Sequence, residues 1–341
     1  MSVSASASAS ANSKKARFTT WTFDEPCKDV GSWNSPSSLG SSSSVSKGNT
    51  SDIVVKLCEA GDNNDNDDNK DLIFIGLHHF DPSSSLESDE PKYTEGLING
   101  VVDKSYLDGK TLMNWMDENY DTFHNGKDVG SMTPTLRVPQ KDNPNKIKRY
   151  VILSLGPCFS FDYGHTIGKA IAKRCNEETK AAGKNIKNAL FILPGDSVGL
   201  FDTIKDLTTS FYTSIYQDNR FRGTLDSVNK IDTPTNGLES LFIHHPSSEF
   251  GDTIIANAIN EGKHIADGVY VAKDIVNTPH NVLNSLSLSC LAKKIANESL
   301  NGCITCTILD KDECERRGMG AFLGVARASE TPPQFIHLTC K

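Results

Sequence analysis

The chain has 341 residues, of which 37% are hydrophobic, so it can bury the core of one large domain or of two domains of ordinary size. Its formal net charge of −8 argues against a nucleic-acid backbone as the main partner. The sequence contains no apolar run of the roughly 20 residues that cross a bilayer, and its N-terminus lacks the apolar segment of a secretory signal. We therefore expect no nucleic-acid partner, no membrane partner and a cytoplasmic location.

The first 50 residues are dominated by Ser, Ala, Gly and Asn, and we predict that 1–50 form a disordered low-complexity tail. Residues 1–23 lack acidic residues until Asp24 and carry Lys14, Lys15 and Arg17, a composition that is also compatible with an organelle transit peptide. An organelle location is therefore the alternative to the cytoplasm.

Short apolar runs that read as strands then alternate with helical patterns. Strands are predicted at 53–57, 72–77, 150–156, 189–194 and 241–243. Helices are predicted at 167–182 and 201–216, where apolar residues recur three and four apart. This alternation is typical of an α/β domain, which we assign to residues 51–250. The basic cluster at 146–149 is interpreted as a solvated edge.

A longer helix is predicted next, because apolar residues recur at helical spacing from Ile255 to Val276. Asp252 can cap its start, and Pro279 prevents its continuation. At 1.5 Å per residue it would be roughly 39 Å long. Since helices of that length often bridge two domains, residues 251–278 are assigned to an interdomain helix.

Residues 279–341 are predicted to be the incomplete start of a second α/β domain. A helix covers 288–296, strands cover 303–309 and 334–340, and Asp310 with Glu313 forms a capping-box pattern for a short helix between the strands. Two short strands and two helices cannot bury both faces of a parallel sheet, and the last strand would present an uncovered edge. We therefore expect either that another chain completes the sheet or that the sequence is truncated.

The best match to a catalytic motif is the G-x-S-x-G pattern around Ser197. A serine hydrolase using Ser197 could take Asp252 and either His264 or His280 as partners. Against this reading, the following helix begins several residues too late for a nucleophile elbow, and no oxyanion-type glycine segment precedes it. We find no metalloprotease, Walker, dinucleotide-binding or EF-hand motif.

The nine cysteines are scattered, which favours free thiols in a reducing compartment. Cys303 and Cys306 have C-x-x-C spacing but lie in strand-like sequence, where residues three apart point to opposite faces. A metal shared by this pair is therefore not expected.

Several segments resemble the leucyl aminopeptidase (cytosol aminopeptidase) family. Residues 273–283, K-D-I-V-N-T-P-H-N-V-L, resemble its R-D-L-V-N-T-P-x-N-x-L segment. Residues 318–325 resemble its G-M-G-x-x-L-x-V segment, and 329–333 its S-x-x-P-P turn, in the same order.

The chain departs from the family pattern at three places. Lys273 replaces the usual Arg, Asn284-Ser285 replace a small residue and Pro, and Arg327-Ala328 occupy a place normally rich in Gly. We expect Gly318 and Gly320 to adopt positive φ in a tight turn.

The resemblance implies a macro-like N-terminal α/β domain and a metallopeptidase that removes N-terminal residues from peptides. It also implies two divalent ions, Zn or Mn, and a homo-oligomer, which is a hexamer in the family. The family's ligands lie in G-K-G-x-T-F-D-S-G-G and N-T-D-A-E-G-R segments that the 341 residues do not contain. We therefore assign no catalytic, cofactor-binding or metal residue, and expect the chain to be inactive alone. A non-catalytic assembly or regulatory subunit and a macro-like binding module are the remaining alternatives.

Overall fold

The computed structural model describes twelve stretches of the chain. They are residues 54–57, 70–79, 110–112, 114–115, 118–119, 129–157, 163–182, 186–193, 199–216, 218, 238–245 and 249–341. These residues fall into two compact units: the larger unit lies between 54 and 216 and between 238 and 270, and the smaller unit contains 271–341. The predicted tail, 1–50, lies outside the described residues, and the domain boundaries drawn from the sequence stay predictions.

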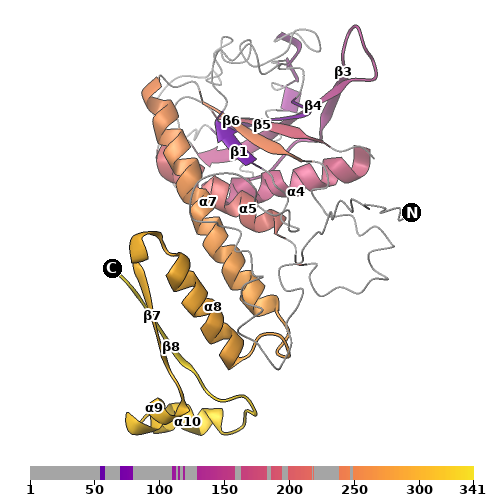
Figure 1. Ribbon diagram of the computed structural model, residues 1–341. Coiled ribbons are helices and arrows are strands. Elements are labelled where there is room, and N and C mark those ends of the chain that lie inside the picture. The colour runs from indigo at the N-terminus through magenta and orange to yellow at the C-terminus, as the bar shows by residue number, and fades with distance from the viewer. Residues whose placement is uncertain are drawn as a thin grey trace, which may run out of the picture. The chain divides into compact units, whose positions relative to one another are not determined.

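The larger unit is built on a six-stranded sheet whose strand order is β1-β6-β5-β2-β4-β3 (Figure 1). Its strands are β1 Val54–Leu57, β2 Leu72–His79, β3 Leu136–Pro139, β4 Ile147–Pro157, β5 Asn188–Ile192 and β6 Ser240–His244. All neighbouring pairs are parallel except β3 with β4, which is antiparallel. The chain therefore has the α/β fold that its alternating pattern predicts.

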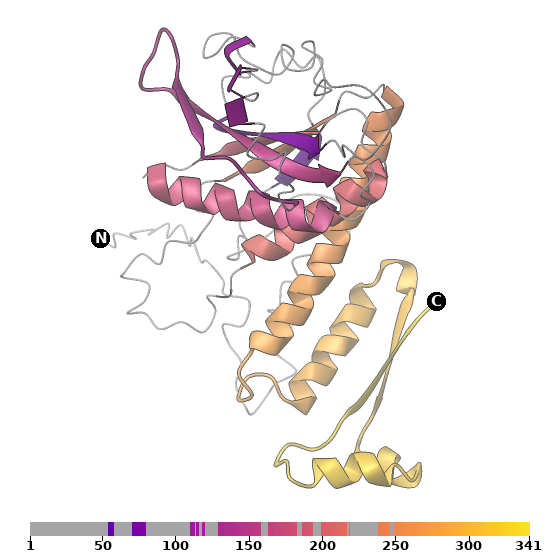
Figure 2. The same ribbon diagram turned by 180° about the vertical axis from the view of Figure 1, so that it is seen from behind.

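Helices α4 Gly164–Ala182 and α5 Leu200–Ile215 lie on one face of this sheet (Figures 1 and 2). Alternate strand residues such as Phe74, Leu153 and Phe191 are fully buried against helix residues such as Ile171 and Leu207. The next residues along each strand, including Ile73 and Ile152, are buried as well. Strands that are buried on both faces read as continuous apolar runs, which is why β2, β4 and β5 are visible in the sequence.

Glycine allows α4 and α5 to approach closely. A Cβ placed on Gly168 would lie 2.2 Å from the carbonyl oxygen of Leu207, closer than any side chain can come. In α7, which spans Glu249–Asn277, a Cβ on Gly262 would lie 2.4 Å from the carbonyl oxygen of Lys205 in α5. These two positions accept only glycine unless the helices move apart.

The structure around the start of β4 differs from the expectation. The strand begins at Ile147 rather than at Tyr150, and the preceding strand β3 was not predicted. The basic cluster is a solvated edge only in its first half: Lys146 and Ile147 are exposed, whereas Lys148 is 2% exposed and Arg149 is 8% exposed. Pairing with β3 extends β4 over these residues and buries them, and a carboxylate from α4 balances the charge of Arg149.

Helix α7 begins at Glu249, two residues before the predicted 251–278 helix, and ends at Asn277, two residues before Pro279. The prediction that Asp252 caps its start is wrong, because Asp252 lies inside the helix. Its first part, through Tyr270, belongs to the larger unit, and the remainder belongs to the smaller unit. Within the described residues, no helix is both long and apolar enough to cross a membrane.

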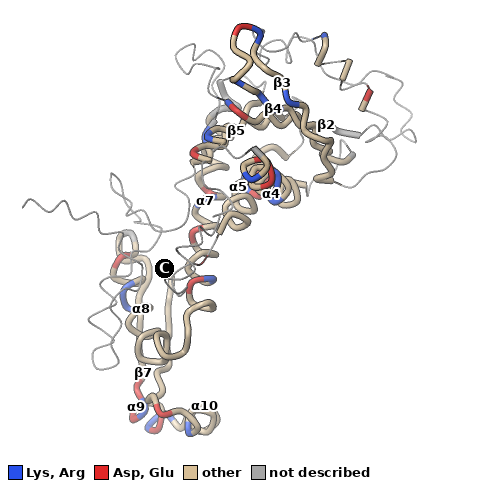
Figure 3. Tube along the Cα trace, turned by 90° about the vertical axis from the view of Figure 1, so that its right-hand side faces the viewer, with Lys and Arg blue, Asp and Glu red and all other residues tan. Residues whose placement is uncertain are grey.

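The smaller unit contains helices α8 Ser285–Glu298, α9 Lys311–Arg316 and α10 Gly320–Ala326, the turn η3 Leu300–Gly302, and strands β7 Ile304–Leu309 and β8 Phe335–Cys340. Helix α8 lies alongside the β7–β8 pair (Figures 1 and 2). Helix α9 is rich in charged residues, and α8 also carries some, whereas α10 has an uncharged sequence, G-A-F-L-G-V-A (Figure 3).

The expectation of a parallel sheet in this unit is wrong, because β7 and β8 pair antiparallel, with Ile304 opposite Cys340 and Leu309 opposite Phe335. The connection between them holds two helices of six and seven residues, each about 10 Å long at 1.5 Å per residue. The chain leaves β7 and enters β8 at the same end of the pair.

Candidate functional site

The segment that resembles the end of the family's interdomain helix forms a tight turn after α7. The hydroxyl of Thr278 donates a hydrogen bond to the carbonyl oxygen of Asp274, and both residues are buried. The carbonyl oxygen of Pro279 then accepts hydrogen bonds from the N–H groups of Val282 and Leu283, both at 2.9 Å. The motif therefore ends one helix and redirects the chain. Its hydrogen bonds have a structural role and do not form a catalytic arrangement.

The departure from the family pattern at Asn284-Ser285 has a clear structural role. Asn284 caps α8, because its side-chain oxygen accepts hydrogen bonds from the N–H groups of Leu286 and Ser287, both at 3.1 Å. The Ser287 hydroxyl accepts in return from the Asn284 N–H at 2.8 Å. The hydroxyl of Ser285 donates a 2.7 Å hydrogen bond to the carbonyl of Pro332, so it joins two of the segments that carry the resemblance.

The glycine segment after α9 is only partly as expected. Gly318 has a φ of 68° and ends α9, and the N–H of Met319 reaches the carbonyl of Cys314 at 3.0 Å. Asp310 caps the start of α9 through a 2.9 Å hydrogen bond from the Glu313 N–H. Gly320 lacks the predicted positive φ, because it is the first residue of α10.

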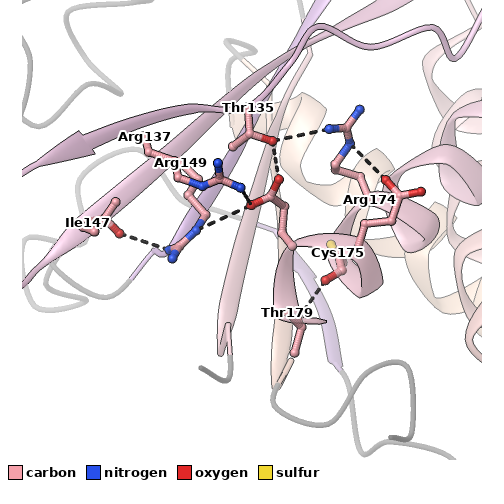
Figure 4. Close-up of polar contacts among 9 residues, drawn as sticks. Thr135, Arg137, Ile147, Arg149, Arg174, Cys175 and Thr179 are labelled. Atoms are coloured by element: carbon pink, nitrogen blue, oxygen red, sulfur yellow. Dashed lines mark hydrogen bonds and ion pairs between the residues drawn. The ribbon is translucent and has the colours of Figure 1, made fainter. Parts of the chain in front are cut away.

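A cluster of charged and polar side chains between β3, β4 and α4 centres on Glu178, which is 5% exposed (Figure 4). The Thr135 hydroxyl donates to Oε1 of Glu178, and Nη2 of Arg137 donates to Oε2 at 2.9 Å. Nε of Arg149 lies 3.7 Å from the same oxygen, and Nη1 of Arg174 donates to the Thr135 hydroxyl at 3.4 Å. We call these five residues the Glu178 cluster.

The interactions of the Glu178 cluster indicate a structural role rather than a catalytic one. Both carboxylate oxygens already have hydrogen-bond donors. Arg149 is joined to the carboxylate by an ion pair rather than a hydrogen bond, and its Nη1 donates to the Ile147 carbonyl at 3.3 Å, which holds that guanidinium against β4. The neighbouring Cys175 is buried, and burial raises the pKa of its thiol, so the thiol stays protonated and unreactive. The cluster therefore joins an edge strand to a helix and offers no free acid, base or nucleophile.

Sequence reasoning missed this cluster. Arg174 and Glu178 are four residues apart and so share a face of α4, which is the one local signal. Their partners lie 25 to 43 residues away on strands whose pairing the sequence does not reveal.

The positions proposed for a serine hydrolase are only partly described. Ser197 lies outside the described residues, as does the side chain of Asp252. His264 is exposed on α7, and His280 is exposed in the turn after it. The serine hydrolase reading stays a prediction.

The cysteines include one exception to the expectation of free thiols. Cys175, Cys303, Cys306, Cys314 and Cys340 are free, whereas Cys290 in α8 is disulfide-bonded. Cys303 precedes β7 and Cys306 lies within it, and both are half-buried. Among the residues that the structure describes, no three His, Cys, Asp or Glu side chains are placed to hold a metal ion.

Comparison with known proteins shows a similarity to one family. The model of the cytosol aminopeptidase family, catalytic domain, matches residues 270–341, which contain the three segments described above. The protein named probable cytosol aminopeptidase from Gloeobacter violaceus is 35% identical over 139 residues, which are 41% of this chain and 27% of that protein. The chain is therefore similar to cytosol aminopeptidases, most specifically over residues 270–341.

The similarity to this family extends beyond the matched domain. A probable cytosol aminopeptidase from Synechocystis is 29% identical over 269 residues, which are 78% of this chain and 46% of that protein. The crystal structure of an M17 aminopeptidase from Trypanosoma brucei covers 85% of this chain at a TM-score of 0.52 and 10% identity, a likeness of fold alone.

The chain spans less than half the length of each of these cytosol aminopeptidase relatives, at 27% and 46% of the two proteins and 48% of the solved chain. The described residues do not fit the two divalent ions that the resemblance implies, because no suitable ligand group occurs among them.

Proposed function

We propose that this chain is the N-terminal domain and the start of the catalytic domain of a leucyl aminopeptidase-type metallopeptidase, which removes N-terminal residues from peptides. The observation that carries the proposal is the match of residues 270–341 to the cytosol aminopeptidase catalytic domain. The order of the motifs within that match supports it, because three separate segments occur in family order.

In this proposal the complete protein holds two divalent ions, Zn or Mn, through segments that the 341 residues do not contain. The printed sequence has neither a G-K-G-x-T-F-D-S-G-G segment nor an N-T-D-A-E-G-R segment. When bound, such a metal pair activates a water molecule and polarises the scissile carbonyl. The chain by itself is therefore proposed to be catalytically inactive.

The described residues have structural roles in this proposal. Asn277, Thr278 and Pro279 end α7 and start the catalytic portion, and Asn284 sets the first turn of α8. Peptide substrate, a cytoplasmic location and assembly into a homo-hexamer are proposed for the complete protein by analogy with the family.

The test uses the purified 341-residue chain, with its mass verified, and leucine p-nitroanilide as substrate. It is assayed with Mn²⁺ or Zn²⁺ and after chelation, beside the Synechocystis relative as the positive control. The proposal predicts no hydrolysis above the buffer rate under any of these conditions. Metal-dependent turnover that co-elutes with the 341-residue chain and disappears with a chelator would show that its own residues are sufficient, and would overturn the proposed inactivity.

A further inference from the structure

The connection between α8 and β7 contains an Asn-Gly pair in an uncommon backbone conformation. Asn301 has a φ of 55° and a ψ of 20°, and among the described residues it is the only one other than glycine with a positive φ. Gly302 follows with a φ of 65°. Both residues are exposed, and a Cβ placed on Gly302 would have no neighbour within 4 Å. The side chain of Asn301 is therefore followed by a peptide nitrogen that no side chain shields.

These two residues carry the groups of an intramolecular reaction. The backbone nitrogen of Gly302 can attack Cγ of the Asn301 amide, and the attack is favoured because the two groups belong to adjacent residues. An N–Cγ bond forms, the Cγ–Nδ2 bond breaks, and ammonia leaves with the proton of the Gly302 N–H. The product is a five-membered imide ring. Water then cleaves either the N–Cγ bond, which gives aspartate, or the bond from nitrogen to the backbone carbonyl carbon, which gives isoaspartate.

One rotation of the peptide between Asn301 and Gly302 brings the reacting atoms together. The φ and ψ of Asn301 and the φ of Gly302 resemble the central residues of a type I′ turn, in which the Gly302 nitrogen points away from Cβ of Asn301. In a type II′ turn ψ is about −120° instead, and the nitrogen eclipses Cβ, as ring closure requires. The φ of Gly302 then becomes about −80°, which glycine adopts as readily as its present value.

Little opposes this rotation. The N–H of Gly302 donates to the carbonyl of Ser299 at 3.2 Å, and one such hydrogen bond contributes little to stability because water replaces it. The hydrogen bonds on either side do not involve the rotating peptide. The N–H of Ser299 donates to the carbonyl of Ala296, and the N–H of Ile304 donates to the hydroxyl of Ser299. The turn can therefore reach the reactive conformation while α8 and β7 stay in place.

We propose that Asn301 is a site of spontaneous deamidation, at which the folded protein converts Asn301-Gly302 to aspartyl-glycine and isoaspartyl-glycine. The consequence falls on α8, which ends at Glu298 with Ser299 as its C-cap. The unpaired carbonyl groups of a last helical turn carry partial negative charge, so a new carboxylate at position 301 opposes the helix dipole. Isoaspartate also lengthens the main chain between α8 and β7 by one carbon atom.

Asn281 provides a matched comparison within the smaller unit. It is exposed and, like Asn301, is the third residue of a turn, because the N–H of Val282 donates to the carbonyl of Pro279 at 2.9 Å. The residue that follows Asn281 is valine, whose β-branched side chain crowds the attacking nitrogen and restricts the backbone. The two sites therefore share exposure and turn position but differ in the residue that controls the reaction.

The test incubates the full 341-residue chain under reducing, mildly alkaline conditions and measures conversion at each asparagine by peptide mass mapping that separates aspartate from isoaspartate. Mapping is required because the sequence has three further Asn-Gly pairs, at 99–100, 125–126 and 236–237. Asn301 is expected to convert at least about tenfold faster than Asn281 and to give both products, and Gly302→Ala is expected to slow conversion at 301 at least about tenfold. Equal rates at 301 and 281, or an Asn301 that reacts in urea but stays intact in the folded chain, would overturn the proposal.

The effect on α8 is measured separately by native-state hydrogen exchange. Asn301→Asp supplies the new charge, and exchange of the last α8 amides is expected to become about two- to fivefold faster. Asn301→Gly is the control, because glycine keeps the positive φ, adds no charge and has no amide to lose, so exchange there should match the wild type. An Asn301→Asp chain whose α8 amides exchange at the wild-type rate would overturn the assigned consequence.

Discussion

The hydroxyl of Tyr212 accepts a 3.0 Å hydrogen bond from the backbone N–H of Val55, a residue 157 positions earlier in the chain. Val54 donates its N–H to Glu239 beside β6, so the N–H of Val55 points to the outer edge of the sheet. The backbone carbonyl of Tyr212 in turn accepts from the hydroxyl of Tyr270 on α7. Two tyrosines thereby join edge strand β1 to α5 and α7 within the larger unit.

Tyr212 is expected to make the larger unit sensitive to high pH. Burial raises the pKa of its hydroxyl to about 12, above the ordinary value of 10. The folded state therefore retains a proton that the unfolded state loses between pH 10 and 12. The resulting stability is fully present below pH 10 and decreases as the pH rises toward 12, by about 2–3 kcal/mol in all. Urea unfolding measured across this range should show a steeper fall for the wild type than for Tyr212→Phe, and equal slopes would contradict this assignment.

Gly168 is expected to tolerate no larger residue. Gly168→Ala should destabilise the larger unit by about 1–3 kcal/mol, because the new methyl group would meet the Leu207 carbonyl and the Ser210 hydroxyl in α5. The matched control is Gly268→Ala in α7, where a Cβ would have no neighbour within 4 Å. Helix propensity should make that change stabilising by up to about 1 kcal/mol. The denaturant midpoints of the two variants should therefore shift in opposite directions, and a shift in the same direction would count against the described packing.

Glu178 is expected to contribute to stability through its arginine partners. Glu178→Gln should cost about 3–5 kcal/mol, because it leaves the guanidinium of Arg149, with a side chain only 10% exposed, without its carboxylate. Glu177→Gln is the control, since Glu177 is half exposed and its ion pairs with Lys173 and Arg174 are long; it should change the free energy of unfolding by less than about 1 kcal/mol. Chemical denaturation of both variants measures the two changes in the free energy of unfolding. Similar decreases for Glu178→Gln and Glu177→Gln would contradict the role assigned to Glu178.

Asn284 is expected to act as the cap of α8. Asn284→Ala should destabilise the smaller unit by about 1 kcal/mol, whereas Asn284→Ser should retain most of the cap, because a serine hydroxyl can also accept from the N–H groups of the first turn. Native-state hydrogen exchange of the α8 amides is the suitable measurement, since it reports on this unit separately from the larger one. If the exchange rates of the α8 amides were the same in Asn284→Ala as in the wild type, Asn284 would not stabilise α8 as a cap.

The elements that the sequence reveals are those whose local pattern decides their structure. The strands β2, β4 and β5 are buried on both faces, so their apolar runs are unmistakable, and α7 shows its helical period up to Pro279. The cap that Asp310 provides is confirmed for the same reason, because it depends on residues three apart. The reciprocal half of the predicted capping box is not formed, because the Glu313 carboxylate accepts from Arg317 instead.

The structural features that the sequence does not reveal are those that depend on residues far away along the chain. Strand β3 has only four residues, L-R-V-P, and exists through its pairing with β4. The burial of Lys148 and Arg149 follows from that pairing and, for Arg149, from Glu178, which lies 29 residues further along the chain. The antiparallel direction of β8 is seen in its pairing with β7, and no residue within the strand indicates it.

The proposed function is tested most directly by supplying the segments that this chain does not contain. A chimera would join residues 1–341 to the part of the Synechocystis cytosol aminopeptidase that follows its matched region. A chimera that unfolds cooperatively is expected to hydrolyse leucine p-nitroanilide in the presence of Mn²⁺ or Zn²⁺ and to lose this activity with a chelator, while the 341-residue chain is expected to remain inactive. A cooperatively folded chimera that binds divalent metal but releases no leucine would contradict the assignment of this chain to an aminopeptidase.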